Sequence, residues 1–529
     1  MRLAGWSVRF ETQAGAVSVE RSGSGACATD EAAFSFAFDG TAGALGLTAR
    51  VPLRVTSCTV TFAHDFAPDE RVLLNGYQSW TDATEEAPWA VMRGLDGLPE
   101  WGVRHYAIDA MGDYRFTSYE GRPGCRHGFT YATVRRGDRV TLLASTGERR
   151  GFTLLRTDAD AGRVTFEPEV PARDLEAGED ALLASFVLEE GSEDAVFDAW
   201  FDAMGTRPYG GDSPRVGYTS WYRHYEDIDE ETVAHDVAAL ARGLDAIDTH
   251  GMGRVAFVDD GWCRKGDWLA PDTESFPHGM AAVAQEIERT GALPGLWMAP
   301  FVVERDSLLA ACHPDWLLRD DNGAPVTTGS HWSGHVALDT QNPAVRAYVG
   351  ECVRTAVADW GFGALKLDFL YAACMLPHAG MTRGELMADA VDLLRQAAGP
   401  SCTILGCGVP LASAFGVFDY CRIGCDVGLT WDNVPPARFF HRERTSTARS
   451  LANTVYRAPL DGRAFGCDPD VFFLRDDVRI SPARKRELLE ADSLFGSLLL
   501  TSDDMDAWGP EERAVFQRAV DTLAERKRR

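Results

Sequence analysis

The feature that most constrains the fold is an alternation of strand-like and helix-like segments that begins after residue 214. Two helices have readable starts: Thr382 and Glu385 form a capping box, and Asn342 and Pro343 fit an N-cap and a first helical residue. Short apolar strand candidates occur at 217–222, 255–259, 293–300, 364–370, 403–407, 420–424, 463–467 and 497–501. Eight strands in alternation with helices predict a (β/α)8 barrel.

Residues 1–205 have a different pattern. Short β-branched segments at 51–55, 57–62, 152–155 and 163–166 are separated by turn residues, and no long amphipathic helix precedes Ser192. This pattern predicts a large β-sandwich. The stretch that follows is rich in Gly and Pro, as linkers are. We therefore expect a sandwich domain at 1–205, a linker at 206–214 and the barrel domain at 215–529.

The composition limits the partners of the chain. Its 52 basic and 79 acidic residues give a net charge of −27, which disfavours nucleic acid and anionic membranes and favours a neutral substrate. The N-terminus has no apolar core of signal-peptide length, and no run approaches the ~18 apolar residues of a membrane span. Twelve cysteines without a CxxC pair predict free thiols and a cytoplasmic location. The histidines show no ligand spacing, so we expect no metal and no cofactor.

The strand candidate at 364–370 carries two opposite charges. Lys366 and Asp368 are two residues apart, so their side chains leave the strand on one face. Burying both is costly unless they pair or the face opens onto a ligand. Two interpretations stay open: a structural ion pair, or an active-site carboxylate at the carboxyl end of a barrel strand with a cation beside it.

Other strand candidates also end in polar and aromatic residues, at the end of the barrel where sites form. Carboxylates and cations bind sugar hydroxyls, and aromatic faces take the C–H side of the ring. A loop at 75–80 with two aromatic residues and two amides also suits a sugar, or is an ordinary hairpin. The candidate binding residues are Trp80, Trp221, Asp259, Asp260, Trp262, Trp297, Lys366, Asp368, Cys407, Arg422 and Asp426.

Several of these residues have a plainer interpretation. Asp259 and Asp260 could cap a helix, and Trp297 could belong to the core. Arg422 could merely neutralise Asp426. Cys407 is more typical of a small packed residue than of a nucleophile, because no histidine is placed to activate it. Further acidic residues after the last two strands are more typical of loops and helix caps: Asp468, Asp470, Asp503 and Asp504.

Taken together, these segments resemble the α-galactosidases of glycoside hydrolase family 36 and its clan. The resemblance covers most of the chain and is specific because the motifs occur in this order and at these spacings. The motifs are NGYQSW at 75–80, VDDGW at 258–262, GLWMAPF at 295–301, HPDWLL at 313–318, ALDTQNP at 337–343, KLDF at 366–369, LGCGVPL at 405–411 and RIGCD at 422–426.

The resemblance implies a retaining α-galactosidase that acts by double displacement on terminal α-galactosyl groups of small oligosaccharides. Asp368 matches the family's nucleophile and Asp426 its acid/base. Lys366 on the same strand face would favour an ionised Asp368, whereas Arg422 would oppose the raised pKa that an acid needs. The resemblance also implies that Trp80 leans over the barrel mouth. By the same resemblance, the residues that bind sugar hydroxyls are Asp259, Asp260, Lys366 and Arg422. Cys407 would lie near the 2-position of the sugar, and the pocket walls would be Trp221, Trp262 and Trp297.

Two departures from the family leave alternatives open. We expect the chain to lack the C-terminal β-sandwich usual in relatives, because one helix follows Asp504, and a partner subunit of a homo-oligomer could cover the barrel instead. The fifth-strand loop, GCGVPL, borders the 2-position, so α-N-acetylgalactosaminidase or galactosyl transfer stays open. A non-catalytic sugar-binding barrel is the alternative from another class, and the presence of both Asp368 and Asp426 argues against it.

Overall fold

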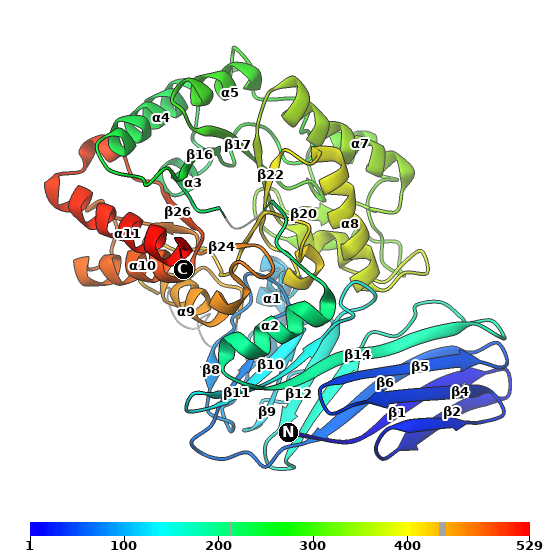
Figure 1. The fold of residues 1–529 in the computed structure, drawn as a ribbon. Coiled ribbons are helices and arrows are strands. Elements are labelled where there is room, and N and C mark those ends of the chain that lie inside the picture. Colours follow the sequence, from blue (N-terminus) through cyan, green and yellow to red (C-terminus); the bar gives the residue numbers. More distant parts are fainter. Residues whose placement is uncertain (211–212, 433–440, 529) are drawn as a thin grey trace.

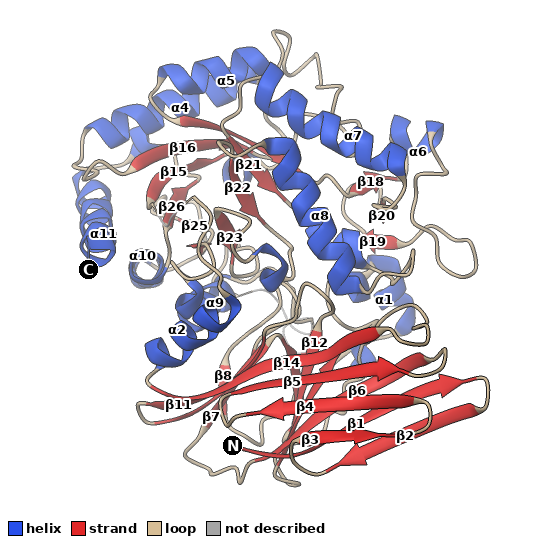
Figure 2. Cartoon of the chain, turned by 45° about the vertical axis from the view of Figure 1, so that its right-hand side comes forward, coloured by secondary structure: helices blue, strands red, loops and turns tan. Residues whose placement is uncertain are grey.

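The structure is a computed structural model that describes residues 1–210, 213–432 and 441–528. Its N-terminal strands form one body, and the green-to-red part of the chain forms a second body beside it (Figure 1). In the second body, helices surround a ring of strands (Figure 2). Within the described ranges, no helix is both long and apolar enough to cross a membrane.

The N-terminal body consists of two antiparallel sheets. One has the order β2 (Gly15–Arg21), β1 (Arg2–Thr12), β6 (Arg54–Ala63), β13 (Arg163–Pro168), β12 (Thr153–Asp158) and β9 (Cys125–Phe129). The other has the order β3 (Gly25–Ala28), β4 (Ala32–Phe38), β5 (Ala42–Ala49), β14 (Asp180–Gly191), β11 (Arg139–Ser145), β10 (Tyr131–Arg136), β7 (Arg71–Leu74) and β8 (Glu85–Glu86).

Aromatic contacts join the inner faces of the two sheets. The ring of Phe186 on β14 lies 5.3 Å, centroid to centroid, from both Phe62 on β6 and Phe166 on β13. All three side chains are buried in one apolar cluster that draws on both sheets. The predicted β-sandwich is thus confirmed.

The second body is built on a nine-stranded parallel sheet that closes into a barrel. Its order is β24 (Gly466–Asp468), β23 (Tyr420–Arg422), β22 (Thr403–Gly406), β21 (Ala364–Leu367), β17 (Leu293–Met298), β16 (Gly253–Val258), β15 (Arg215–Thr219), β26 (Leu498–Thr501) and β25 (Val471–Phe472). The backbone N–H of Ser497 donates to the carbonyl of Cys467 at 2.8 Å, which joins the eighth strand to β24. The predicted (β/α)8 barrel is confirmed.

The seventh barrel strand differs from its prediction at 463–467. It consists of two short pieces: β24 pairs with β23, and β25 pairs with β26. Pro469 between them has no N–H to donate, and Asp470 has a φ of 87°. A proline followed by a left-handed residue cannot continue a ladder, so the strand breaks at the rim of the barrel.

Helices cover the outside of the barrel: α4 (Glu230–Asp245), α5 (Met280–Arg289), α7 (Pro343–Arg354), α8 (Arg383–Ala398), α9 (Thr447–Arg457), α10 (Pro482–Phe495) and α11 (Pro510–Arg528). Two short helices follow strands β15 and β18 (Val302–Glu304) in the chain: α3 (Trp221–His224) and α6 (Leu308–Cys312). Both predicted helix starts are confirmed: Thr382 and Glu385 form a capping box, and the Asn342 side chain accepts from the N–H of Ala344. The sandwich body carries α1 (Glu100–Tyr106), and α2 (Glu193–Met204) leads towards the barrel.

Smaller elements complete the chain. A three-stranded antiparallel sheet of β18 (Val302–Glu304), β20 (His335–Ala337) and β19 (Thr327–Gly329) follows β17. The short helical turns are η1 (Leu95–Gly97), η2 (Ile108–Ala110), η3 (Thr355–Asp359), η4 (Leu370–Cys374), η5 (Leu411–Ala414), η7 (Ala458–Leu460) and η8 (Met505–Ala507). The division at 205 and 215 stays a prediction, which the end of α2 at Met204 and the start of β15 at Arg215 support.

One buried arginine fastens the sandwich to the barrel mouth. Arg457 at the end of α9 is fully buried and donates to the Asn75 side chain at 3.0 Å. It also donates to the carbonyls of Ser79 at 2.5 Å, Thr81 at 3.0 Å and Ile423 at 2.7 Å. Because Ile423 directly follows β23, this guanidinium holds the loop at 75–80 over the carboxyl end of the barrel.

Candidate active site

A cavity of about 370 Å³ lies where barrel strands end and the loop at 75–80 crosses over them. Eight of the eleven candidate residues line it: Trp80, Trp221, Asp259, Asp260, Trp297, Lys366, Asp368 and Asp426. The other three, Trp262, Cys407 and Arg422, do not line it. Strand ends on opposite sides of the barrel thus contribute to one site, as a barrel requires.

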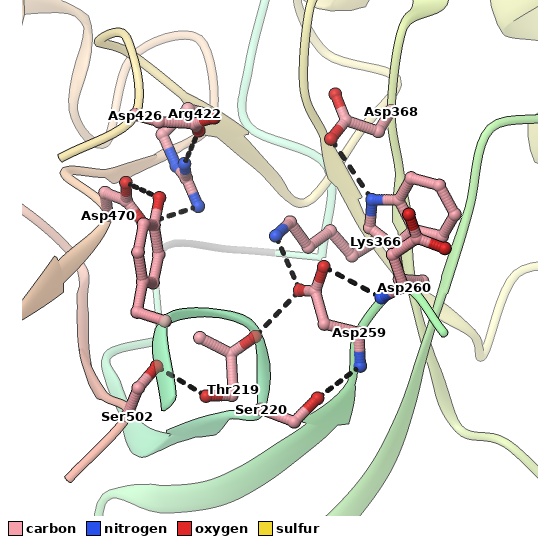
Figure 3. A network of polar contacts seen from close by, with 12 residues as sticks. Thr219, Ser220, Asp259, Asp260, Lys366, Asp368, Arg422, Asp426, Asp470 and Ser502 are labelled. Atoms are coloured by element: carbon pink, nitrogen blue, oxygen red, sulfur yellow. Dashed lines mark hydrogen bonds and ion pairs between the residues drawn. The ribbon is translucent and has the colours of Figure 1, made fainter. Parts of the chain in front are cut away.

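Lys366 on β21 forms an ion pair with Asp259, which follows β16. The Lys366 ammonium donates to Asp259 Oδ2 at 2.7 Å, and the Thr219 hydroxyl donates to the same oxygen at 2.8 Å (Figure 3). Burial opposes the charge of Lys366, but the Asp259 carboxylate raises the pKa of Lys366 above its ordinary value. The structural pair considered from the sequence, Lys366 with Asp368, is therefore replaced by a pair between two strands.

Asp260 is held by a second set of contacts. Its Oδ1 lies 2.9 Å from the Lys265 ammonium, and its Oδ2 accepts from the Trp332 indole N–H at 2.9 Å. Burial raises the pKa of Asp260 to about 7, against the opposing effect of Lys265. Neither Asp259 nor Asp260 caps a helix, because the next helix along the chain, α5, begins at Met280. The capping interpretation is thus wrong.

Asp368 is the first residue after β21. Its Oδ1 accepts from the N–H of Phe369 at 2.8 Å, and its Oδ2 accepts from the Trp297 indole N–H at 3.1 Å. Phe369 has a φ of 53°, so the strand ends earlier than the predicted residue 370 and the chain turns beneath the carboxylate. Burial raises the pKa of Asp368 to about 6; Lys366 lowers it and Asp426 raises it further. Burial therefore outweighs the lysine that the sequence places on the same face.

Asp426 forms an ion pair with the fully buried guanidinium of Arg422. Arg422 Nη1 lies 3.1 Å from Asp426 Oδ1, while Nε lies 2.7 Å from Asp468 and Nη2 lies 3.0 Å from Asp470. The Asp426 side chain is 43% exposed, whereas those of Arg422, Asp468 and Asp470 are at most 1% exposed. Arg422 thus orients Asp426 from the buried side of the site. The predicted contact between Arg422 and the sugar does not fit this buried position.

The four acidic residues predicted for loops and caps divide into two pairs. Asp504 caps η8, and Asp503 accepts from the N–H groups of Leu474 and Arg475, so these two have local structural roles. Asp468 and Asp470 instead lie beneath the site as partners of Arg422. Asp470 also accepts from the hydroxyl of Tyr222 (Figure 3).

The aromatic candidates differ in position. Trp297 lines the cavity beside Asp368, so it is more than a core residue. Trp262 is fully buried behind it and donates its indole N–H to the Trp297 carbonyl at 2.9 Å. Trp80 packs edge-on against Phe369 with ring centroids 5.1 Å apart. Cys407 is buried in the fifth-strand loop next to Gly408, where a Cβ would lie 3.0 Å from the Trp80 ring.

Sequence reasoning missed several residues that line the cavity, among them Glu226, His331, Trp332, His441 and Glu443. They lie in loops, where no hydrophobic period marks which side chains turn inward. Trp332 has a φ of 56°, a left-handed backbone conformation that no pattern in the sequence predicts. The tryptophan in the segment GSHWSG was the one available signal, because a large aromatic residue in a polar loop is typical of binding sites.

Comparisons with known proteins show what this chain is similar to. The Melibiase family model matches residues 216–377. The structure of the α-galactosidase TtGalA from Thermus thermophilus in complex with stachyose is 28% identical, with a TM-score of 0.71, over 93% of this chain and 99% of that one. The family 36 α-galactosidase AgaA from Geobacillus stearothermophilus superposes with a TM-score of 0.63 at 12% identity, over 98% of this chain and 76% of that one.

Matches among curated sequences are shorter. AgaA from Geobacillus stearothermophilus is 27% identical over 157 residues, which are 28% of this chain and 20% of that protein. The A type blood alpha-D-galactosamine galactosaminidase of Flavonifractor plautii is 30% identical over 139 residues, which are 24% of this chain and 13% of that protein. The matched part of the chain thus spans about a fifth or less of the length of these curated relatives.

Proposed function

We propose, from the similarity of this chain to the α-galactosidases of glycoside hydrolase family 36, that it hydrolyses terminal α-linked galactosyl groups of small oligosaccharides. One observation carries the proposal: the carboxyl groups of Asp368 and Asp426 line one cavity together with the bound pair of Lys366 and Asp259. Two carboxyl groups at one sugar site are what glycoside hydrolysis requires.

The proposed reaction is a double displacement that retains the anomeric configuration. Asp368 attacks the anomeric carbon while Asp426 protonates the departing oxygen; Asp426 then deprotonates the water that releases galactose. The contacts from Trp297 and the N–H of Phe369 keep the carboxylate of Asp368 in place for attack. Retention predicts carboxyl groups about 5–5.5 Å apart, against about 6.5–9.5 Å for inversion.

Galactose would be recognised by the carboxyl groups of Asp259 and Asp260 and the ammonium of Lys366. Adjacent side chains diverge, so the two carboxyl groups can bind neighbouring hydroxyls, including the axial one at position 4. The indoles of Trp297 and Trp332 form a wall for the C–H face of the ring. Solved complexes of TtGalA with stachyose and with p-nitrophenyl α-D-galactopyranoside support this class of substrate.

A second substrate is favoured by one comparison. The Flavonifractor plautii relative is named for α-D-galactosamine, whose 2-substituent differs from that of galactose. In this chain, the predicted 2-position region is the fifth-strand loop, which packs under Trp80. Assays with the aryl α-galactoside and the aryl α-N-acetylgalactosaminide, run side by side, would decide between the two sugars.

We also propose a cytoplasmic location. The cysteines of the chain, all of them within the described ranges, are free thiols, which suits a reducing compartment. The high negative charge suits a neutral sugar as partner. A homo-oligomer stays a prediction, which sedimentation of the purified protein would test.

Hydrolysis of p-nitrophenyl α-galactoside tests the proposed activity. We expect turnover of this substrate and little turnover of the corresponding α-glucoside, because the site would bind the axial hydroxyl. Proton NMR of the first product formed should show α-galactose, as retention requires. A folded protein without turnover of the galactoside would contradict the proposal.

A further inference from the structure

One wall of the cavity carries unsatisfied polar atoms that the proposed mechanism does not use. They are Glu443 Oε2 and His441 Nε2, and neither has a hydrogen-bond partner among the described residues. The Glu443 side chain is fully buried and that of His441 is 11% exposed. Leaving a buried polar atom without a partner is unfavourable, so two such atoms in a cavity wall point to a ligand.

One oxygen of Glu443 is already bound. Glu443 Oε1 accepts from the Thr81 hydroxyl at 2.7 Å, whereas Oε2 has no hydrogen-bond partner among the described residues. Glu443 Oε2 lies 3.9 Å from His441 Nε2, too far for a direct hydrogen bond. A single hydroxyl oxygen about 2.8 Å from each atom would bridge this gap.

The two groups have the protonation states that binding a hydroxyl needs. Burial lowers the pKa of His441 to about 3, so its imidazole is neutral at neutral pH. Burial raises the pKa of Glu443 to about 7, with a further upward contribution from Asp113. A neutral imidazole and a carboxyl group together can both donate to and accept from one hydroxyl.

This wall and the pair that would bind galactose come from different segments of the chain. Successive ring contacts, Trp80 with Phe369 and Phe369 with Trp332, lead from the sandwich loop to the indole that donates to Asp260. The segment that carries His441 and Glu443 returns to the acid/base candidate, because the N–H of Ser446 donates to the Asp426 carbonyl at 2.9 Å.

We propose that His441 and Glu443 bind a hydroxyl of the leaving sugar and make the enzyme prefer α-galactosides whose leaving group is a second sugar. The inference rests on the proposed function, because it assigns the leaving group to the side of Asp426. The sandwich contributes through Thr81, so this selectivity depends on contact between the two bodies. A purely structural role for Glu443 at this contact is the competing explanation.

The test compares melibiose, whose leaving group is glucose, with p-nitrophenyl α-galactoside, whose leaving group lacks sugar hydroxyls. His441→Phe keeps a flat ring and removes both nitrogens, and Glu443→Leu removes both oxygens. For each variant we expect kcat/KM to fall about 10–100-fold on melibiose and less than about threefold on the aryl substrate, because one buried hydrogen-bonded site is lost. Glu443→Gln keeps hydrogen-bonding capacity and should retain most of the preference.

Glu148 offers a matched control. Its buried carboxyl also accepts from a threonine hydroxyl, that of Thr130 at 2.9 Å, and its pKa is likewise raised by burial to about 7, but it does not line the cavity. Glu148→Leu should change kcat/KM for both substrates by the same factor. Equal losses on both substrates in His441→Phe would overturn the inference.

A binding measurement separates failure of this inference from failure of the proposed function. In the Asp368→Asn background, tryptophan fluorescence titrations give Kd for melibiose and for galactose. We expect His441→Phe to weaken melibiose binding at least tenfold and galactose binding little. If the wild type hydrolyses neither substrate, the proposed function fails, and this titration still decides the inference: an unchanged melibiose Kd would overturn it.

Discussion

The ammonium of Lys366 lies 2.7 Å from the carboxylate of Asp259, two strands away in the sheet, and not against Asp368 on its own strand face. The cation therefore compensates a substrate-binding carboxylate, while the nucleophile candidate keeps two neutral donors, Trp297 and the N–H of Phe369. Within one cavity, the lysine therefore pairs with the carboxylate proposed to bind the sugar and not with the carboxylate proposed to react with it.

The pair of Lys366 and Asp259 can be tested through substrate preference. Asp259→Asn should raise the activation free energy that kcat/KM reports for aryl galactosides by ~2–4 kcal/mol. The reason is that the site loses a charged acceptor for a sugar hydroxyl and leaves Lys366 unpaired. Kinetics on aryl galactoside and glucoside, alongside thermal melts, check this. A stable variant with an unaltered galactose-to-glucose preference would remove Asp259 from the site.

The pH profile should report Asp368. With a pKa of about 6, this carboxyl is protonated at lower pH and cannot attack, so kcat/KM should fall as the pH drops through about 6. Trp297→Phe removes a hydrogen bond that favours the ionised form, so the acidic limb should move to higher pH. An acidic limb at the same pH in both proteins would show that another group controls it.

Asp426→Ala should discriminate between leaving groups. General-acid help is needed when the departing oxygen is basic, so turnover of raffinose-type sugars should fall far more than turnover of nitrophenyl galactosides. Steady-state rates on both substrates provide the measurement. Equal losses on the two would count against Asp426 as the acid.

Removal of divalent metals should leave activity unchanged. Within the described ranges, no group of three or more His, Cys, Asp or Glu residues is arranged to hold a metal ion, and the sequence has no ligand spacing. Assays after EDTA treatment, with and without added divalent ions, check this. Loss in EDTA that a divalent ion restores would refute the prediction.

Much of the fold follows from local sequence patterns. The capping box at Thr382 and the alternation of strands and helices identify the barrel because helix caps and hydrophobic periods are local signals. The split seventh strand escaped prediction, because it depends on Pro469 and on the backbone of Asp470.

The site was predictable where residues sit at strand ends, as Asp259 and Asp368 do. Contacts between segments that are distant in the sequence could not be predicted. The interaction of Arg422 with Asp468 and Asp470 depends on how two strands meet in the closed barrel. The inward turn of His441 and Glu443 depends on packing against the sandwich, as the contact of Glu443 with Thr81 illustrates. Tertiary contacts of this kind leave no period in the sequence.

Azide rescue of Asp368→Ala is the most direct test of the central claim. Removing the nucleophile should abolish turnover of an aryl α-galactoside. It should also leave room for a small anion on the face of the sugar opposite the leaving group. Added azide should then partly restore release of the phenol and yield β-galactosyl azide, identified by NMR. Turnover at the wild-type rate without azide would contradict the account.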